Sequence, residues 1–385
     1  MYYAASPGGG DDLLEGPDSI CGELLKAKSA APILCAKKEE IGAIEVFSVS
    51  DRAVLTSVPM ADAPSGKVGH TAYTFGIVCG AFIAGYLFSL WFLQVYYLGD
   101  QEHYTRFYNS LYGIDPQYWK LLQRRHLGSS EPLYRYVIGV AAYFGIDRIH
   151  YLSAWNGVLT GSLAYILLKY RASIPFSSLF FTNYYLFVLL GSAERLKFAY
   201  IFLAISVCLR ILWKKYAVSV LSIFFHTQAL IQFVSALCYY IIVHRNKVFS
   251  TPTRAVLVPA GLVISLGVAG ILFFGSVGEV VALKSAGYMA RSGGLAEIVQ
   301  WSLLIATGVY VFRDKLAFAM GMIPLGFFTF LYGNRVNVAT FAFFATMALI
   351  YRRTNNPLVL MVMMYMSFKS IQFIADVIRY GTGYP

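Results

Sequence analysis

The stretch YTFGIVCGAFIAGYLFSLWFLQVYYL, residues 73–98, decides the fold class, because it contains no charged side chain from end to end. About 20 apolar residues carry a helix across a hydrocarbon core about 30 Å thick. A spanning segment must satisfy its own backbone hydrogen bonds, which a helix of this length does. The stretch therefore predicts a transmembrane helix that stays in the protein as a signal anchor.

The rest of the chain has a similar composition. Of its 385 residues, 58% are hydrophobic and only 13% are charged, which is more apolar surface than a water-soluble protein buries. We predict an all-α fold, a polytopic transmembrane helical bundle of about 10–11 spans. Further apolar runs fall at about 132–147, 151–168, 174–191, 196–213, 217–243, 255–275, 297–312, 316–333, 336–351 and 357–378.

The run at 217–243 is long for one crossing and is interrupted by His226, Thr227 and Gln228. A tilted helix and a broken pair of helices both fit this pattern.

Charge divides the chain into two expected regions. Residues 1–70 hold ten of the 20 acidic residues and six of the 31 basic ones, and we expect a cytoplasmic tail, partly disordered, or an extension that a start at Met60 would remove. Residues 71–385 are the expected membrane domain, with periplasmic loops at about 99–130 and 276–296. The strong basic excess of this domain indicates an anionic lipid or an anionic substrate.

Orientation follows from basic residues in short loops, which favour the cytoplasm. In the second half of the chain, alternating loops carry basic residues, as this rule requires. In the first half, a simple count of crossings places four basic residues outside. Either a re-entrant segment changes the number of crossings before them, or these four residues bind the substrate. The cytoplasmic set is Arg245, Lys247, Arg254, Arg313, Lys315, Arg352 and Arg353, and the outward set is Lys169, Arg171, Lys214 and Lys215.

Ionisable residues at the ends of membrane spans are candidates for chemistry, because burying them is costly. Asp100 follows the first span, Glu131 stands before Pro132 at the start of the next apolar run, and His226 lies inside another. Each is a candidate general base. The alternatives are a solvated helix-end charge for Asp100, helix capping for Glu131 and cross-helix packing for His226.

Basic and aromatic side chains form a second group of candidates. Arg195 lies between two apolar runs beside Glu194 and Lys197, where a local ion pair in a tight turn is the alternative. Arginine forks and lysine ammonium groups are suited to binding a pyrophosphate, although snorkelling to lipid headgroups also explains single members of the set. Lys284, Tyr288 and Arg291 are spaced for one helical face, and together with Arg335 they are expected to hold a pyrophosphate.

Four short motifs follow one another across about residues 90–340. They are GDxxxY at Gly99–Tyr104, Glu131-Pro132 with Tyr134, Arg195 with Ala199, and HTQAL at His226–Leu230. In this order they resemble the EpsG family of Wzy-like polysaccharide polymerases. The long acidic N-terminal region departs from the family pattern.

The resemblance implies a glycosyltransferase of the bacterial inner membrane, with which a GT-C-like architecture is compatible. It also implies Arg195 as a further pyrophosphate ligand, and Tyr104, Tyr108 and Tyr288 as residues that stack on sugars. Such enzymes join oligosaccharide repeat units carried on undecaprenyl pyrophosphate, at the periplasmic face, into O-antigen, capsule or exopolysaccharide. The partners it implies are that lipid-linked oligosaccharide, membrane lipid and a chain-length regulator. We expect no nucleic-acid partner and no cofactor. We also expect no metal, because arginine and lysine can neutralise the leaving pyrophosphate.

Two other functions fit the same features. A flippase or transporter of lipid-linked oligosaccharide also needs many spans and a cationic cavity, but the sequence shows no internal repeat or paired broken helices. An O-antigen ligase-like glycosyltransferase uses similar arginine-rich sites, but no large late periplasmic loop is visible. We rank the polymerase first.

Overall fold

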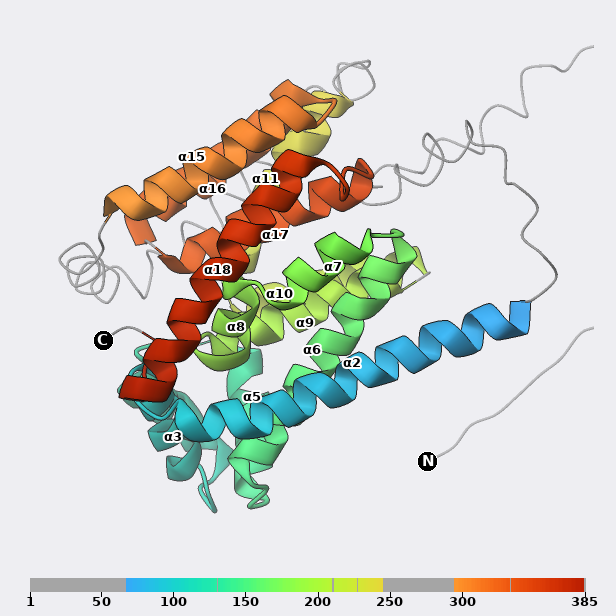
Figure 1. Cartoon of the computed structure of the whole chain (residues 1–385). Coiled ribbons are helices and arrows are strands. Elements are labelled where there is room, and N and C mark those ends of the chain that lie inside the picture. Colours follow the sequence, from blue (N-terminus) through green and yellow to red (C-terminus); the bar gives the residue numbers. More distant parts are fainter. Residues whose placement is uncertain are drawn as a thin grey trace, which may run out of the picture. The chain divides into compact units, whose positions relative to one another are not determined.

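In a computed structural model of the chain, the described residues are 67–129, 131–209, 211–226, 228–244, 294–332 and 334–383, and their regular secondary structure is entirely helical (Figure 1). The first helices are α2 (Lys67–Val95), α3 (Asp100–Ser110), η2 (Pro116–Tyr118), α4 (Trp119–Leu127), α5 (Pro132–Tyr143), α6 (Arg148–Lys169), α7 (Ile174–Phe181) and α8 (Tyr184–Gly191). The others are α9 (Glu194–Cys208), α10 (Leu212–Phe225), α11 (Gln228–Val243), α15 (Gly294–Val311), α16 (Lys315–Tyr332), α17 (Asn334–Ile350) and α18 (Pro357–Tyr380).

The prediction of an all-helical chain is confirmed for the described residues. By length and composition, α2 and α18 can each cross a membrane. The pair α7 and α8, bent by 40° at Thr182 and Asn183, becomes a third candidate if the two helices form one span. The remaining apolar helices are shorter than these. The prediction of about 10–11 spans therefore stays a prediction.

The helix α2 packs along α6, and small residues let the two helices approach closely (Figure 1). A Cβ atom built on Gly157 would lie 2.9 Å from the backbone oxygen of Phe82. Across the same interface, the Thr160 hydroxyl donates to the carbonyl of Ala81 at 2.9 Å, and Asn156 donates to the Ser89 hydroxyl at 2.8 Å. These contacts pair α2 and α6 in antiparallel directions.

Local signals in the sequence explain where several helices begin. Asp147 caps α6 by accepting the backbone N–H of His150 at 2.9 Å, and Asn356 caps α18 by accepting from Leu358 at 3.0 Å. Proline follows in the first turn of α5, α7 and α18, where its missing N–H costs no helical hydrogen bond. Caps of this kind satisfy the free N–H groups of the first turn.

Two apolar runs differ from their expected extent. The run predicted at 132–147 contains the 12-residue helix α5, which is about 18 Å long and too short for a hydrocarbon core of about 30 Å. The run at 217–243 is a broken pair, since α10 ends at Phe225 and α11 begins at Gln228. The break coincides with His226, whose extended backbone ends the first helix.

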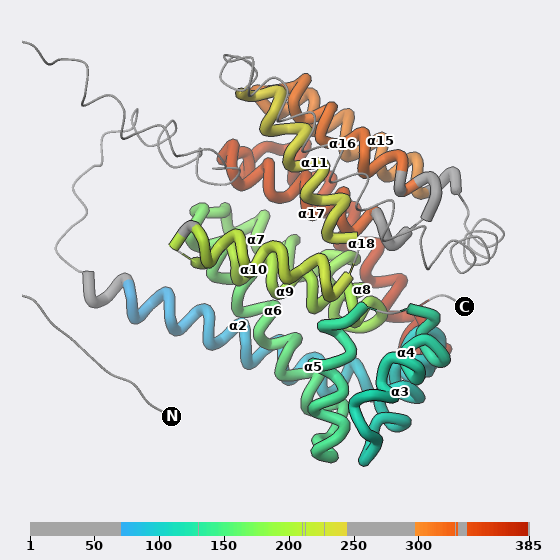
Figure 2. The backbone as a smooth tube through the Cα atoms, turned by 180° about the vertical axis from the view of Figure 1, so that it is seen from behind, coloured from blue at the N-terminus to red at the C-terminus, as the bar shows by residue number. Residues whose placement is uncertain are grey.

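A second group of helices forms the C-terminal part of the chain. Helices α11, α15, α16 and α17 pack against one another, and α18 contacts α7, α8 and α15 (Figure 2). After α18 the chain turns at Gly381, which has φ +69° and whose carbonyl accepts the N–H groups of Tyr97 and Leu98 at 3.2 and 2.9 Å. The end of α18 therefore lies beside the end of α2.

Candidate functional site

Charged side chains from separate parts of the chain meet where α3, α5, α6 and α9 come together. Glu131 is the extended residue that precedes α5, and Arg195 is the second residue of α9. Arg195 Nη1 donates to Glu131 Oε1 at 2.7 Å, and each side chain is only 11% exposed. The Arg195 Nε lies 3.5 Å from the hydroxyl of Tyr104 on α3, the long limit of a hydrogen bond. The structure thus brings together three of the predicted site residues.

The ion pair determines the charge state of Glu131. Burial by itself raises the pKa of this carboxyl group, but the positive charge of Arg195 and of protonated His226 outweighs burial and holds the pKa at about 2. Glu131 is therefore ionised at neutral pH. Gln123 on α4 holds it from the other side, donating to the Glu131 backbone oxygen at 3.1 Å and facing its Oε2 at 3.5 Å.

A second ion pair lies directly beside the first. Glu194, the residue before Arg195, is 1% exposed and accepts a charged hydrogen bond from Arg148 at the start of α6. Its other oxygen accepts the Tyr134 hydroxyl at 3.0 Å, and the ring of Tyr134 packs 6.1 Å from that of Tyr104. Glu194 and Arg195 thus pair with different helices, which makes the alternative of a local ion pair within this turn wrong.

Lys197 is a third basic residue of this cluster, three positions after Glu194 on α9. Its side chain is fully buried, and among the described residues no hydrogen bond reaches Nζ, which lies 6.0 Å from the centre of the Phe198 ring. With Arg148 and Arg195, the cluster holds three basic groups against the two carboxylates of Glu131 and Glu194. This surplus favours an additional anion.

His226 sits at the break between α10 and α11. Its Nδ1 accepts the backbone N–H of Gln228 at 3.0 Å, so the neutral ring carries its proton on Nε2. Its charge, when the ring is protonated, acts on the carboxylate of Glu131. His226 therefore belongs to the same neighbourhood as the Glu131–Arg195 pair.

Two predicted residues of α3 have other positions. The Tyr108 hydroxyl donates to the carbonyl of Ile146 at 2.7 Å, which engages its polar end away from the ion pair. Burial, followed by the nearby Tyr151 and Asp147, raises the pKa of Tyr108 to about 12. Asp100 is the half-buried first residue of α3, one turn before Tyr104. Tyr104, rather than Tyr108, is the aromatic residue next to Arg195.

The predicted residues of the later loops lie largely outside the described residues. The structure does not describe residues 245–293. This segment contains Lys284, Tyr288 and Arg291 and most of the predicted loop at 276–296. Arg335 is the second residue of α17, and only its backbone is described. Their role as pyrophosphate or sugar ligands stays a prediction.

Sequence reasoning missed two members of the cluster, Arg148 and Gln101, and named Tyr134 only as part of a motif. Arg148, Tyr134 and the fully buried Gln101 of α3 join Glu194 to its surroundings, and Arg148 also contacts Gln101. Gln101 in turn donates to the carbonyl of Gly191 at the end of α8. Arg148 comes directly after the N-cap of the apolar helix α6, which indicates a buried acidic partner. The sequence does not identify which carboxylate it binds.

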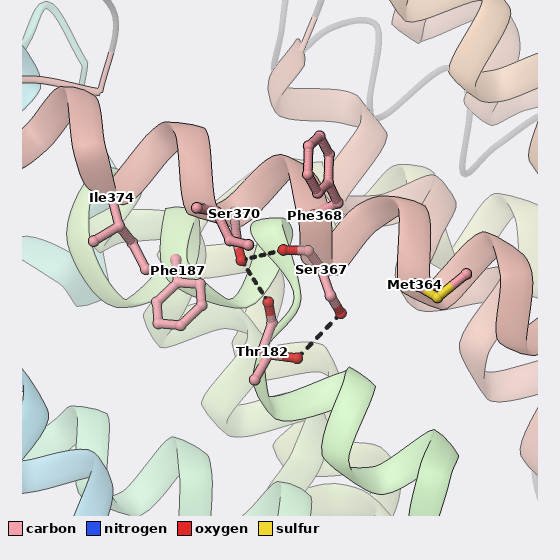
Figure 3. Close-up of a pocket in the computed structure, with 8 residues that line it drawn as sticks. Thr182, Phe187, Met364, Ser367, Phe368, Ser370 and Ile374 are labelled. Carbon is pink, nitrogen blue, oxygen red and sulfur yellow. Dashed lines mark hydrogen bonds between the residues drawn. The ribbon is translucent and has the colours of Figure 1, made fainter.

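A groove of about 460 Å³ lies at the bend between α7 and α8, against α18 (Figure 3). Its hydroxyl groups bind one another or the backbone: Thr182 donates to Ser367 at 3.1 Å, and Ser370 donates to the Thr182 carbonyl at 2.7 Å. The rest of the lining is apolar, including Phe187 and Phe368. This groove suits hydrocarbon and offers no cation for a phosphate.

The fold and the site together define the class of protein. It is an all-helical protein over its described residues, with two or three helices able to cross a membrane and a buried cluster of carboxylates and basic groups. No protein-family model matches the chain, and no curated protein or solved structure matches it either.

Proposed function

We propose that this chain is a multi-pass glycosyltransferase of the bacterial inner membrane, a Wzy-like polymerase of undecaprenyl-pyrophosphate-linked oligosaccharide repeat units. The observation that carries the proposal is the buried Glu131–Arg195 ion pair with Tyr104 alongside, because these residues come from separate motifs of the EpsG resemblance. A glycosyl transfer of this kind needs a carboxylate for the acceptor hydroxyl and cations for the leaving pyrophosphate. The cluster holds both within one neighbourhood.

Contacts between basic turns support a membrane orientation. Lys169 at the end of α6 donates to the Val207 carbonyl near the end of α9 at 3.0 Å. The turn after α6 contacts the turn after α17 through Ser173 and Thr354. Tyr351 donates to Asp314, which brings the turn between α15 and α16 to the same end. Basic residues in short turns are expected of a cytoplasmic face. Those in the three turns are Lys169, Arg171, Arg313, Lys315, Arg352 and Arg353.

The ion-pair cluster lies at the other end of the helices. Arg148 opens α6 and Lys169 closes it, so the 22 residues of α6 separate the two by about 33 Å. That distance is close to the thickness of a hydrocarbon core. With the basic turns in the cytoplasm, the cluster faces the periplasm, where a Wzy-like polymerase works.

A topology in which the short helix α5 does not cross the membrane agrees with the positions of the basic residues. Because Tyr134 on α5 and Arg148 at the start of α6 both bind Glu194, the chain returns to the same end after α5. Omitting α5, counting α10 and α11 separately and assigning one crossing to the run at 255–275 gives about eleven spans. The bases at Lys169, Arg171, Lys214 and Lys215 then face the cytoplasm like the others.

The test is a polymerisation assay with purified protein. The protein is incubated in detergent with a matching undecaprenyl-pyrophosphate repeat unit and no nucleotide sugar, and products are separated on a gel. We expect a ladder with the wild type and with Glu102→Gln, which opens an exposed i, i+4 pair with Arg106. We expect none with Glu131→Gln or Arg195→Ala.

One outcome would reject the proposed site, and another would reject the polymerase. A ladder that persists in Glu131→Gln and Arg195→Ala would remove the site from the chemistry. No ladder with the wild type, together with transbilayer movement of the same lipid in liposomes, would identify a flippase instead.

A further inference from the structure

The Glu131–Arg195 pair cannot serve both of its expected roles in the arrangement that the structure shows. A carboxylate held at 2.7 Å by a guanidinium, with a pKa of about 2, is a weak base for a sugar hydroxyl. An arginine bound to that carboxylate has less positive charge available for a leaving pyrophosphate. The pair must therefore open before either group can act.

Arg195 has the donors needed to take a second anion. Its Nη1 binds Glu131 and its Nε faces Tyr104, while among the described residues no hydrogen bond reaches Nη2. A pyrophosphate carries more negative charge than a carboxylate and accepts the forked hydrogen bonds of arginine. It can compete with Glu131 for the same guanidinium.

The surroundings hold both partners in place when the pair opens. Glu194, which immediately precedes Arg195, stays bound to Arg148 and Tyr134, so the start of α9 keeps its position while the Arg195 side chain turns. Gln123 keeps its hydrogen bond to the Glu131 backbone at 3.1 Å. Only the Arg195 side chain has to move.

We propose that Arg195 exchanges Glu131 for the pyrophosphate of the lipid-linked donor, and that this exchange turns Glu131 into the general base. The inference rests on the proposed function. The acceptor hydroxyl oxygen bonds to the anomeric carbon of the donor sugar while its proton passes to the Glu131 carboxylate. The bond from that carbon to the phosphate oxygen breaks, and its electron pair stays on the pyrophosphate, held by Arg195. Glu131 then returns its proton to water.

Such an exchange couples binding to protonation. The pyrophosphate and the Glu131 carboxylate compete for the Arg195 guanidinium. Neutralising Glu131 must therefore strengthen pyrophosphate binding, and by the same factor bound pyrophosphate weakens the Glu131–Arg195 pair. A pair that only supports the fold predicts the reverse, because its loss would disturb Arg195 and weaken binding. The sign of the change separates the two roles.

The experiment measures the binding of inorganic pyrophosphate to the full chain in detergent by calorimetry. We expect Glu131→Gln to bind at least about tenfold more tightly than the wild type, and Arg195→Ala to lose binding. Glu102→Gln removes an equal charge from α3 without touching the pair, and its affinity should equal that of the wild type. Equal or weaker binding by Glu131→Gln would overturn the exchange.

Infrared difference spectra give a second test, whose first observation uses the wild type alone. Adding pyrophosphate should shift a carboxylate stretching band, and Glu131→Gln should lack that change. A wild-type spectrum without any such shift would also overturn the exchange. A ladder formed without tighter binding by Glu131→Gln rejects the exchange alone, whereas tighter binding without any ladder rejects the polymerase alone.

Discussion

Ser173 and Thr354, 181 residues apart, are joined by two hydrogen bonds. The N–H of Ser173 donates to Thr354 Oγ1 at 3.1 Å, and the Ser173 hydroxyl donates to the Thr354 carbonyl at 3.0 Å. The turn that follows α6 therefore lies against the turn that follows α17. Both turns carry an arginine with φ +53°, Arg171 and Arg352, so their basic groups share one end of the helices.

This contact predicts that both turns face the cytoplasm. Arg171→Cys and Arg353→Cys, each in a chain with its native cysteines replaced by alanine, should react with a membrane-impermeant maleimide only after the cells are opened. Tyr112→Cys, exposed at the other end, should react in spheroplasts directly. Labelling of Arg171→Cys and Arg353→Cys from opposite sides would show that the proposed topology is wrong.

Gly157 is predicted to be essential to the packing of α2 on α6. Alanine there would place its Cβ 2.9 Å from the Phe82 carbonyl oxygen, a backbone atom that cannot turn away. We expect Gly157→Ala to destabilise the protein by about 1–3 kcal/mol, as overpacking does. Gly76→Ala is the matched control on α2, because nothing lies within 4 Å of its added Cβ. Thermal unfolding in detergent measures both, and equal midpoints for the two variants would contradict the packing argument.

The helical character of the chain could be predicted from apolar runs, but the number of crossings could not be read from hydropathy alone. The run at 132–147 is as apolar as its neighbours, yet α5 stops at Tyr143 before a turn at Gly145, and Asp147 caps the next helix. A glycine followed by a capping aspartate is a stop and start signal that length arguments overlook. The signal was present in the sequence.

The candidate site was predictable in part for a physical reason. Glu131 and Arg195 could be named because charged groups beside apolar runs are costly unless they are paired or functional. Their pairing, and the separate pairing of Glu194 with Arg148, depends on how α5, α6 and α9 pack. No local pattern specifies contacts between side chains that are 46 or 64 residues apart.

Polymerisation is predicted not to depend on a metal ion, since Arg195 can neutralise the leaving pyrophosphate. Treating the protein with EDTA and dialysing it should leave the rate of ladder formation unchanged. Adding Mg²⁺ or Mn²⁺ afterwards should have no effect beyond that of ionic strength. Activity lost on chelation and restored by a divalent ion would refute this prediction.

The buried pair Arg148–Glu194 is predicted to matter more for stability than the exposed pair Arg106–Glu102. Removing Glu194 leaves Arg148 buried without its carboxylate, which typically costs about 3–5 kcal/mol. The Arg106–Glu102 pair is largely solvated and should contribute less than about 1 kcal/mol. Denaturation of Glu194→Ala and Glu102→Ala in parallel measures the difference, and similar losses in the two would argue against a structural role for the inner pair.

Glu131 is predicted to make stability depend on pH in the acidic range. Its pKa in the folded protein is about 2 and its ordinary value is 4.5, so the folded state favours the ionised form. The resulting stabilisation is fully present above about pH 4.5 and is lost as the pH falls through 2. A shift of this size corresponds to a contribution on the order of 3 kcal/mol.

Because other carboxylates titrate in the same range, the informative quantity is the difference in stability between wild type and Glu131→Gln, measured by thermal unfolding from pH 6 to pH 2.5. That difference should shrink as the pH falls, and a constant difference would mean that the Arg195 pair does not hold Glu131 ionised.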